Sequence, residues 1–383
     1  MKACKTYFIT AFFAAAALLT SCASEEKTFS DFQQEIAQLS ASEQNSRLDG
    51  YFEKYQTFPV IAGNTVCFVL KDSISNEVYL SGDMCSWKPD SMRMERISRS
   101  SYFFKEFVCP ENARLEYKFV TDSVSVLDPR NLLYAEGPFG RNSLLLMPEY
   151  EYPAVTLLQR GRAMTTLDTL RFSSRIMNNS REIYYYHHPK AAAGSQLIVF
   201  NDGSEYVNLG KAAVILDNLI ESEKIPAVNA VFVNPVERMT EYWLDDRYIR
   251  MVFRELIPYI KKKYNLPSDV PVSIGGVSLG GLTSLYALKN YNDNLSFIFS
   301  QSGALQIDDS KIISILSGLE KITAKIYLSY GTYENTETEH QRLTELLKLK
   351  NAAYTIDSFP EGHNWGNWRA HLDRALIYGL RGK

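Results

Sequence analysis

The sequence predicts an α/β fold with a mostly parallel sheet, preceded by an all-β sandwich. In the second half of the 383-residue chain, short apolar segments alternate with amphipathic segments of helical spacing. Such alternation places helices on both faces of a parallel sheet. In residues 59–150, short runs rich in Val, Phe and Tyr are separated by turn residues, which is typical of a sandwich.

The N-terminus has the pattern of an export signal. Two lysines precede an apolar run from Phe8 to Leu19, and small residues lead to Cys22. This order predicts a signal peptide over residues 1–21, and the run is too short to span a bilayer comfortably. Because the segment ending at Cys22 resembles a bacterial lipobox, we expect lipidation there and an exported lipoprotein of the outer membrane. The acidic pair Glu25-Glu26 is similar to a surface-export signal of some Gram-negative bacteria.

Composition limits the partners of the chain. The formal net charge is -3 and no basic run is present, so no nucleic-acid partner is expected. Once Cys4 is removed with the signal and Cys22 carries lipid, three cysteines remain: Cys67, Cys85 and Cys109. An odd number of cysteines cannot all pair internally, and no specific disulfide is predicted. No Cys/His set has zinc spacing, so neither a metal nor a cofactor is expected.

The first half after the signal divides into a polar segment and a β-rich module. Residues 22–58 have weak helical spacing, which predicts a tether with one or two short helices. In residues 59–150 the predicted strands are NTVCFVLK, EVYLSGD, YFFKEFV and LEYKFVTD. The segment VYLSGDMCSWKPDSMRM and those that follow it resemble the immunoglobulin-like module, related to glycogen-binding modules, that precedes enterochelin esterases. The resemblance leaves two roles for Trp87, stacking on a sugar ring or closing the edge of the sandwich.

Residues 151–383 contain the elements of the parallel sheet. The predicted strands are EIYYYHH, QLIVFND, NAVFVNP, PVSIGGV, LSFIFSQSG, AKIYLSYG and AYTIDSFP, and the clearest helices are RYIRMVFRELIPYIKKKY and HQRLTELLKL. This order fits an α/β-hydrolase domain. Ligand sites in such sheets lie at the carboxyl ends of the strands.

The stretch IGGVSLGGL, residues 274–282, has the form of a nucleophile elbow. A predicted strand comes directly before Ser278 and a predicted helix directly after it, which is the context that a strained Gly-x-Ser-x-Gly turn requires. Gly276 and Gly280 lack a Cβ, so strand and helix can approach closely. The amide of Leu279 would open the helix and serve as one oxyanion donor.

A serine nucleophile needs a base and an acid, which follow it in that fold in the chain order Ser, acid, His. His363 lies in FPEGHNWGNWR, after the last predicted strand, and is the expected base, whereas His371 falls on a helix face. The acid is expected after the preceding strand, within YGTYENTETEH. Glu334 is the first choice, and Glu337 and Asp357 are the alternatives.

The second oxyanion donor is expected after an earlier central strand. LIVFNDGSEYVNLG supplies a turn in which Gly203 lets the backbone come close, and the amide of Ser204 or Glu205 would donate.

Together, NDGSEY, IGGVSLGGLTSLYALKN, YGTYENTE and EGHNWGNWR resemble the enterochelin esterase and esterase D group, which includes bacterial feruloyl and acetyl-xylan esterases. The likeness runs over residues 59–383. It implies that Arg238 and Glu241, an Arg-x-x-Glu of the group, lie near the rim of the active site; an ion pair that holds the loop is the alternative. Trp365 and Trp368 are expected to border the substrate pocket, with Trp243 near them.

The expected function is a serine carboxylic-ester hydrolase. The resemblance favours the esters of a ferric catecholate siderophore, for which Arg238, Arg247 and Arg369 would supply positive charge. A feruloyl or acetyl esterase acting on plant polysaccharide is the alternative. The alternative of another class is a catalytically inert, glycan-binding surface lipoprotein. The oligomeric state does not follow from the sequence.

Overall fold

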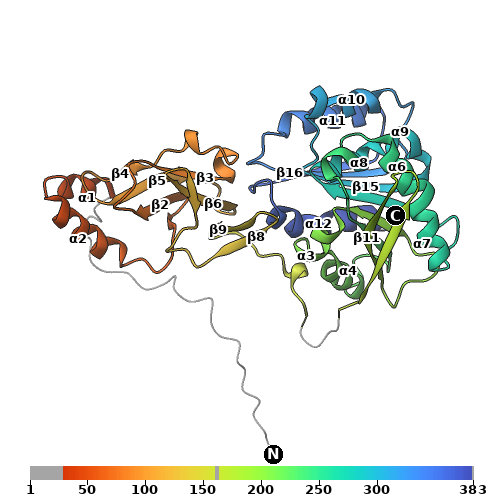
Figure 1. The fold of residues 1–383 in the computed structure, drawn as a ribbon, viewed down its shortest axis with the longest axis horizontal. Coiled ribbons are helices and arrows are strands. Elements are labelled where there is room, and N and C mark those ends of the chain that lie inside the picture. Colours follow the sequence, from red (N-terminus) through yellow and green to blue (C-terminus); the bar gives the residue numbers. More distant parts are fainter. Residues whose placement is uncertain (1–28, 160–163, 382–383) are drawn as a thin grey trace, which may run out of the picture.

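The computed structural model describes residues 29–159 and 164–381, which form a β-rich part and an α/β part side by side (Figure 1). The predicted signal segment 1–21 and Cys22 lie outside the described residues. Within the described ranges, no helix is long and apolar enough to cross a membrane. Helices α1 (Phe29–Ile36) and α2 (Ala41–Phe52) open the β-rich part.

Two antiparallel sheets face each other in the β-rich part. One has the order β1-β2-β5-β4, and the other β3-β6-β9-β8 with β7 beside β6. Their strands are β1 (Val60–Ala62), β2 (Thr65–Lys71), β3 (Val78–Gly82), β4 (Glu95–Arg96), β5 (Tyr102–Val108), β6 (Arg114–Thr121), β7 (Val124–Val126), β8 (Tyr134–Gly137) and β9 (Gly140–Leu146), with short 3₁₀ turns η1 (Asp83–Cys85) and η2 (Pro89–Ser91) after β3. Phe68, Phe103 and Tyr117 are among the side chains buried between the sheets, and α1 and α2 pack on the first sheet through Ile36 and Phe52.

The α/β part is built on an eight-stranded sheet of order β10-β11-β13-β12-β14-β15-β16-β17. The strands are β10 (Leu167–Ser174), β11 (Asn179–His187), β12 (Leu197–Asn201), β13 (Asn229–Val233), β14 (Val272–Val277), β15 (Leu295–Gln301), β16 (Lys325–Gly331) and β17 (Tyr354–Phe359). The six strands from β13 to β17 are parallel, and β10 and β11 form an antiparallel hairpin at one edge. Sequence patterns missed β10, because its alternating side chains are mostly polar and exposed, as an edge strand allows.

Helices cover both faces of this sheet (Figure 1). On one face lie α6 (Asp246–Met251), α7 (Ile257–Lys263), α8 (Leu279–Tyr286), α9 (Leu288–Tyr291), α10 (Ile307–Ser317) and α11 (Glu337–Leu349). On the other lie α3 (Gly203–Asn208), α4 (Ala212–Glu221) and α12 (Trp365–Leu380), with the 3₁₀ turn η3 (Ala154–Thr156) against α4. Short connections are α5 (Arg238–Glu241) and η5 (Asn292–Asn294). The amphipathic segment predicted as one helix is divided by a π-helical turn, η4 (Val252–Leu256), between α6 and α7.

Candidate active site

Ser278 lies at the tip of the turn between β14 and α8. Its backbone has φ 54° and ψ -122°, a strained conformation for a residue with a side chain. A Cβ on Gly276 would lie 2.5 Å from the carbonyl carbon of Gly280. The strand and the helix therefore approach as closely as the elbow predicted from the sequence requires.

A chain of hydrogen bonds runs from Ser278 to Glu334. His363 Nε2 lies 2.9 Å from Ser278 Oγ, and His363 Nδ1 lies 2.8 Å from Glu334 Oε2. The order along the chain of bonds is hydroxyl, imidazole, carboxylate. With Nδ1–H donating to the carboxylate, Nε2 is left free to accept the serine proton.

Glu334 is held in a single orientation. Its side chain is 2% exposed. Glu334 Oε1 accepts hydrogen bonds from Ser302 Oγ at 2.6 Å and from the Gly331 amide at 2.8 Å. Ser302 Oγ in turn accepts from Trp368 Nε1 at 2.9 Å. A carboxylate fixed by these donors keeps the His363 ring in one orientation.

The two alternative acids bond elsewhere. Glu337 is exposed at the start of α11 and accepts from Gln341 Nε2 at 3.0 Å. Asp357, in β17, accepts from the Tyr327 hydroxyl at 2.9 Å. Among the three acids considered from the sequence, Glu334 is the one that reaches His363.

In the turn after β12, one of the amides expected as the second oxyanion donor has another acceptor. The Ser204 amide donates to Asn234 Oδ1 at 2.6 Å, so the assignment of that amide as an oxyanion donor is wrong. A Cβ on Gly203 would lie 2.5 Å from the carbonyl carbon of Phe232, which shows how closely this turn packs on β13. Leu279 opens α8, and its N–H has no acceptor within the helix.

Arg238 and Glu241 form separate ion pairs. Arg238 donates to both oxygens of Asp202, at 2.6 and 2.8 Å. Burial raises the pKa of Asp202, and the Arg238 pair acts in the opposite direction. Glu241 is 2% exposed and binds Arg181 at 2.7 Å. Of the two roles considered for Glu241, the structure therefore shows the ion pair, and Glu241 is not among the residues that line the cavity over Ser278.

A cavity of about 700 Å³ opens over Ser278 and His363. The α/β part contributes Asp202, Glu205, Arg238, Trp365 and Trp368 to its wall. The β-rich part contributes Trp87, Glu116, Lys118, Glu136, Phe139 and Asn142. Of these six residues, only Trp87 was considered from the sequence. For the other five residues, the one signal in the sequence is that Phe139, an apolar residue, stands in the turn Gly-Pro-Phe-Gly. In the structure Phe139 is 98% exposed.

Other residues considered from the sequence have partners away from this cavity. Arg247 pairs with Asp245 at 2.8 Å, and Arg369 donates to the Leu209 carbonyl at 3.1 Å. Trp243 Nε1 donates to an aspartate of α10 at 3.2 Å.

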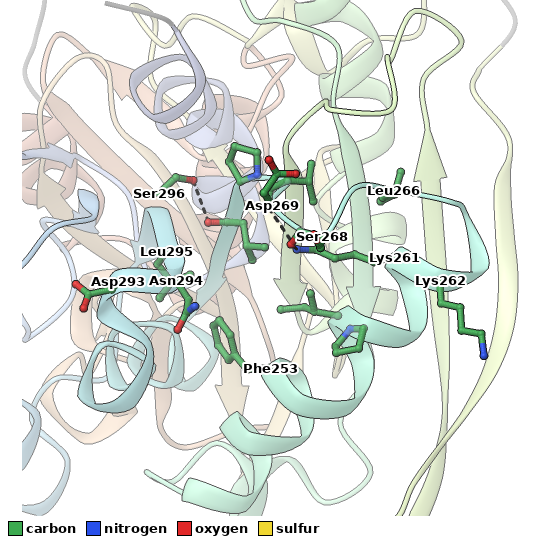
Figure 2. A pocket seen from close by; sticks show the side chains of 15 residues that line it. Phe253, Lys261, Lys262, Leu266, Ser268, Asp269, Asp293, Asn294, Leu295 and Ser296 are labelled. Carbon is green, nitrogen blue, oxygen red and sulfur yellow. Dashed lines mark hydrogen bonds between the residues drawn. The ribbon is translucent and has the colours of Figure 1, made fainter.

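A second cavity, lined by Lys261, Asp269 and Ser296 among others, lies at the amino ends of β14 and β15 (Figure 2). It is therefore at the opposite end of these strands from Ser278.

The fold has several relatives among known structures. Ferric enterobactin esterase from Salmonella typhimurium superposes with a TM-score of 0.71 at 18% identity, over 86% of this chain and 98% of that one. Enterobactin esterase from Shigella flexneri, crystallised with 2,3-dihydroxy-N-benzoyl-glycine, has a TM-score of 0.66 at 20% identity, over 82% and 92%. A ferulic acid esterase has a TM-score of 0.50 at 14% identity, over 57% and 99%.

Sequence comparison finds a relative and a matching family. The uncharacterized protein YbbA of Bacillus subtilis (strain 168) is 26% identical over 177 residues, 42% of this chain and 70% of that protein. The family model described as a putative esterase matches residues 174–378, more than half of the chain. The chain belongs to the putative esterase family, and the carboxylic ester hydrolase expected from the sequence is confirmed at the level of that family.

Proposed function

We propose that the chain hydrolyses carboxylic esters with Ser278 as nucleophile, His363 as general base and Glu334 as the acid that orients it. The observation that carries this proposal is the pair of contacts at His363, 2.9 Å to Ser278 Oγ and 2.8 Å to Glu334 Oε2. An idle serine in a glycine-rich turn would need neither contact. The same contacts speak against a catalytically inert binding protein.

The reaction follows from the geometry. His363 Nε2 takes the proton of Ser278 Oγ while that oxygen attacks the ester carbonyl. The Leu279 amide and the amide of Gly203 or Glu205 stabilise the oxyanion. The tetrahedral intermediate expels the alcohol, which takes the proton from His363 and leaves an acyl-serine. Water, deprotonated by His363, attacks the acyl-serine and releases the acid and Ser278.

Hydrolysis of p-nitrophenyl acetate tests this assignment. We expect Ser278→Ala to lower kcat by roughly 10⁶-fold, as loss of the nucleophile does in a serine hydrolase. Ser284→Ala is the matched control, since Ser284 lies in α8, the helix that follows Ser278, and its hydroxyl donates to the Gly280 carbonyl at 2.6 Å. Full activity in Ser278→Ala would overturn the nucleophile assignment.

For the substrate, we propose first the ester of a catecholate siderophore. The support is the two-part architecture. The Salmonella typhimurium ferric enterobactin esterase superposes on 86% of this chain, a larger share than residues 151–383 alone could supply, whereas the ferulic acid esterase superposes on 57%. Trp87 and Phe139, both from the β-rich part, offer apolar rings to an aromatic ligand.

A feruloyl ester of plant polysaccharide is the second candidate, and the charge of the cavity favours it. A ferric catecholate is strongly anionic and needs a basic site. In the cavity wall Arg238 is paired with Asp202, Glu116 with Arg114 and Glu136 with Arg141, and Lys118 is accompanied by Glu205. Positive charge is therefore largely compensated, which suits a neutral or weakly charged aromatic ester. An acetyl ester would leave the exposed aromatic rings without a partner.

A substrate panel separates these candidates. The full chain is assayed with a triserine-lactone catecholate siderophore, with and without iron, with methyl ferulate and with acetylated xylan. The highest kcat/KM on the lactone supports the first candidate, and a preference for its iron-free form agrees with the charge of the cavity. The highest kcat/KM on methyl ferulate supports the second. A preference for acetylated xylan would contradict both.

The domain boundaries and the location of the chain belong to the same proposal. We propose that residues 59–150 are an immunoglobulin-like module with its own core between two facing sheets, and that residues 151–383 are the hydrolase domain. We further propose export, with lipidation of Cys22 after removal of residues 1–21. The support is the sequence pattern alone. Incorporation of labelled palmitate into the parent, and none into Cys22→Ser, is the expected result; equal labelling would contradict it.

A further inference from the structure

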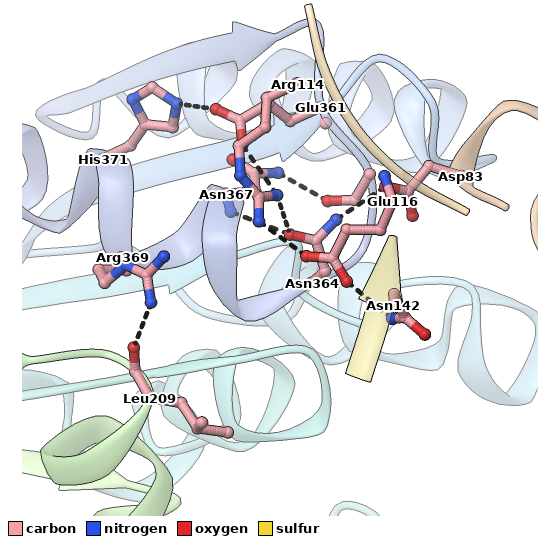
Figure 3. A network of polar contacts seen from close by, with 12 residues as sticks. Asp83, Arg114, Glu116, Asn142, Leu209, Glu361, Asn364, Asn367, Arg369 and His371 are labelled. Carbon is pink, nitrogen blue, oxygen red and sulfur yellow. Dashed lines mark hydrogen bonds and ion pairs between the residues drawn. The ribbon is translucent and has the colours of Figure 1, made fainter. Parts of the chain in front are cut away.

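The β-rich part contacts the loop that carries His363 through buried polar side chains (Figure 3). Asp83 follows β3 and Arg114 opens β6, and the two are 2% and 3% exposed. Asn364, the residue after His363, donates through Nδ2 to Asp83 Oδ2 at 2.9 Å. Asn364 Oδ1 accepts from Arg114 Nη1, also at 2.9 Å. Both ends of the Asn364 amide are therefore held by the β-rich part.

The residue before His363 is held as well. A Cβ on Gly362 would lie 2.1 Å from Asp83 Cγ, so the backbone at Gly362 lies directly against the carboxylate. The Arg114 amide donates to the Pro360 carbonyl at 3.2 Å, which aligns the start of β6 with the loop. These contacts bracket His363 on both sides along the chain.

The carboxylates of Asp83, Glu116 and Glu361 outnumber the guanidinium of Arg114 in this contact, and burial together with the neighbouring Glu116 raises the pKa of Asp83. Arg114 Nη2 donates to Glu116 Oε1 at 2.8 Å, and its Nη1 lies 3.8 Å from Glu361 Oε2. Asp83 accepts two further hydrogen bonds, from the Glu116 amide at 2.8 Å and from Trp87 Nε1 at 3.0 Å. Buried ions are costly unless they are paired, and they stabilise an interface less than apolar packing does. What such hydrogen bonds provide is a defined geometry.

We propose that Asp83 and Arg114 are positioning residues for His363, which hold residues 360–364 so that Nε2 stays within hydrogen-bonding reach of Ser278 Oγ. This inference rests on the proposed function and concerns only how the base is held. His363 itself is 42% exposed, so the cavity side leaves it room to move. A displacement of about 1 Å in a catalytic group costs roughly 10²-fold in rate.

Asn364→Asp in the full chain tests the proposal directly. Aspartate still caps α12, where Asn364 Oδ1 accepts from the Asn367 amide at 3.1 Å, and it still accepts from Arg114. It removes the donor to Asp83 and places two carboxylates in contact. We expect kcat for p-nitrophenyl acetate to fall by roughly 10²-fold, with KM little changed. Asp83→Asn should act in the same direction.

The matched control is Asp128→Asn. Asp128 is an equally buried carboxylate of the β-rich part, 3% exposed, which accepts from the Tyr117 hydroxyl at 2.7 Å. We expect this variant to keep the parental kcat. Thermal unfolding shows which variants are folded, and the rate at which a fluorophosphonate labels Ser278 reports the base independently of substrate binding.

Parental kcat and labelling rate in folded Asn364→Asp and Asp83→Asn would overturn the proposal. A fall in kcat of the same size in Asp128→Asn would also overturn it, because a general loss of stability would then suffice. The Ser278→Ala assay is independent of both outcomes: an active parent with an inactive Ser278→Ala leaves the proposed function in place whichever way the positioning variants behave.

Discussion

His363 Nε2 lies 2.9 Å from Ser278 Oγ, although the two residues are 85 positions apart in the sequence. Ser278 belongs to the turn after β14 in the middle of the sheet, and His363 to the loop after β17 at its edge. Because β14 and β17 are parallel, their carboxyl ends lie at the same end of the sheet. The contact therefore depends on how the last loop folds back over the sheet.

Glu334 should contribute more to kcat than the other acids near it. We expect Glu334→Gln to lower kcat on the order of 10⁴-fold, because the amide disfavours the imidazole tautomer that can accept the serine proton. The measurement is steady-state hydrolysis of p-nitrophenyl acetate. Glu337→Gln, at an exposed position three residues away, is expected to behave as the parent. The reverse ranking of the two variants would show that Glu334 is not the acid.

Phe139 should select for aromatic substrates. Its ring is 98% exposed and lines the cavity over Ser278. Burial of part of a phenyl ring against a ligand is worth about 1.5 kcal/mol, so Phe139→Ala should raise KM for methyl ferulate about tenfold and leave KM for methyl acetate unchanged. Leu132→Ala is the control, since Leu132 is 87% exposed in the same part of the chain. Equal KM values for the parent and Phe139→Ala on methyl ferulate would contradict this role.

Gly276 should be irreplaceable for steric reasons. An added Cβ would lie 2.5 Å from the carbonyl carbon of Gly280, and backbone cannot move aside as a flexible side chain can. We expect Gly276→Ala to lower the free energy of unfolding by about 1–3 kcal/mol, measured by urea denaturation. Gly194 has open space at its Cβ position, so Gly194→Ala should be neutral. Equal stability of the two variants would show that the elbow can relax.

Stability should fall in mild acid, in part through His340. The ring is fully buried in α11, its Nδ1 lies 2.7 Å from the Thr336 carbonyl oxygen, and burial lowers its pKa. In the unfolded state the pKa of His340 is near the usual value of about 6.5, so below that pH the unfolded chain binds a proton more readily than the folded protein does. The contribution of His340 to stability is therefore present above that pH and is lost as the pH falls below it.

His340→Leu removes this titration. The unfolding free energies of the parent and the variant are compared by urea denaturation at several pH values from neutral to mildly acidic. We expect a shallower decline for the variant on acidification. Parallel curves would mean that the ring is not held neutral by the fold.

Much of the site could be predicted from sequence because its signals are local. The elbow is a strand, a strained turn and a helix within nine residues, and Gly276 is required by its contact with Gly280 inside the same nine. Gly275 and Gly280 instead face Phe299 and Asp202, which are distant in the sequence. The order nucleophile, acid, base restricts the base to the last loop, where His363 is the one histidine. The longer β-strands were predicted from residue type and period, except β9 and β10, and the alternation in β10 is mostly polar and resembles a loop. Strands β1, β4, β7 and β8 were not predicted either, because they are too short to show a period.

Only the tertiary structure decided the partners. Arg238 and Glu241 form one motif in the sequence, yet folding pairs Arg238 with Asp202, 36 positions away, and Glu241 with Arg181, 60 positions away. It likewise decided that the β-rich part forms half of the cavity wall and reaches Asn364 from Asp83, 281 positions away. Residue periodicity extends over a few turns or strands, so it records which face of an element is buried but not which distant element covers that face.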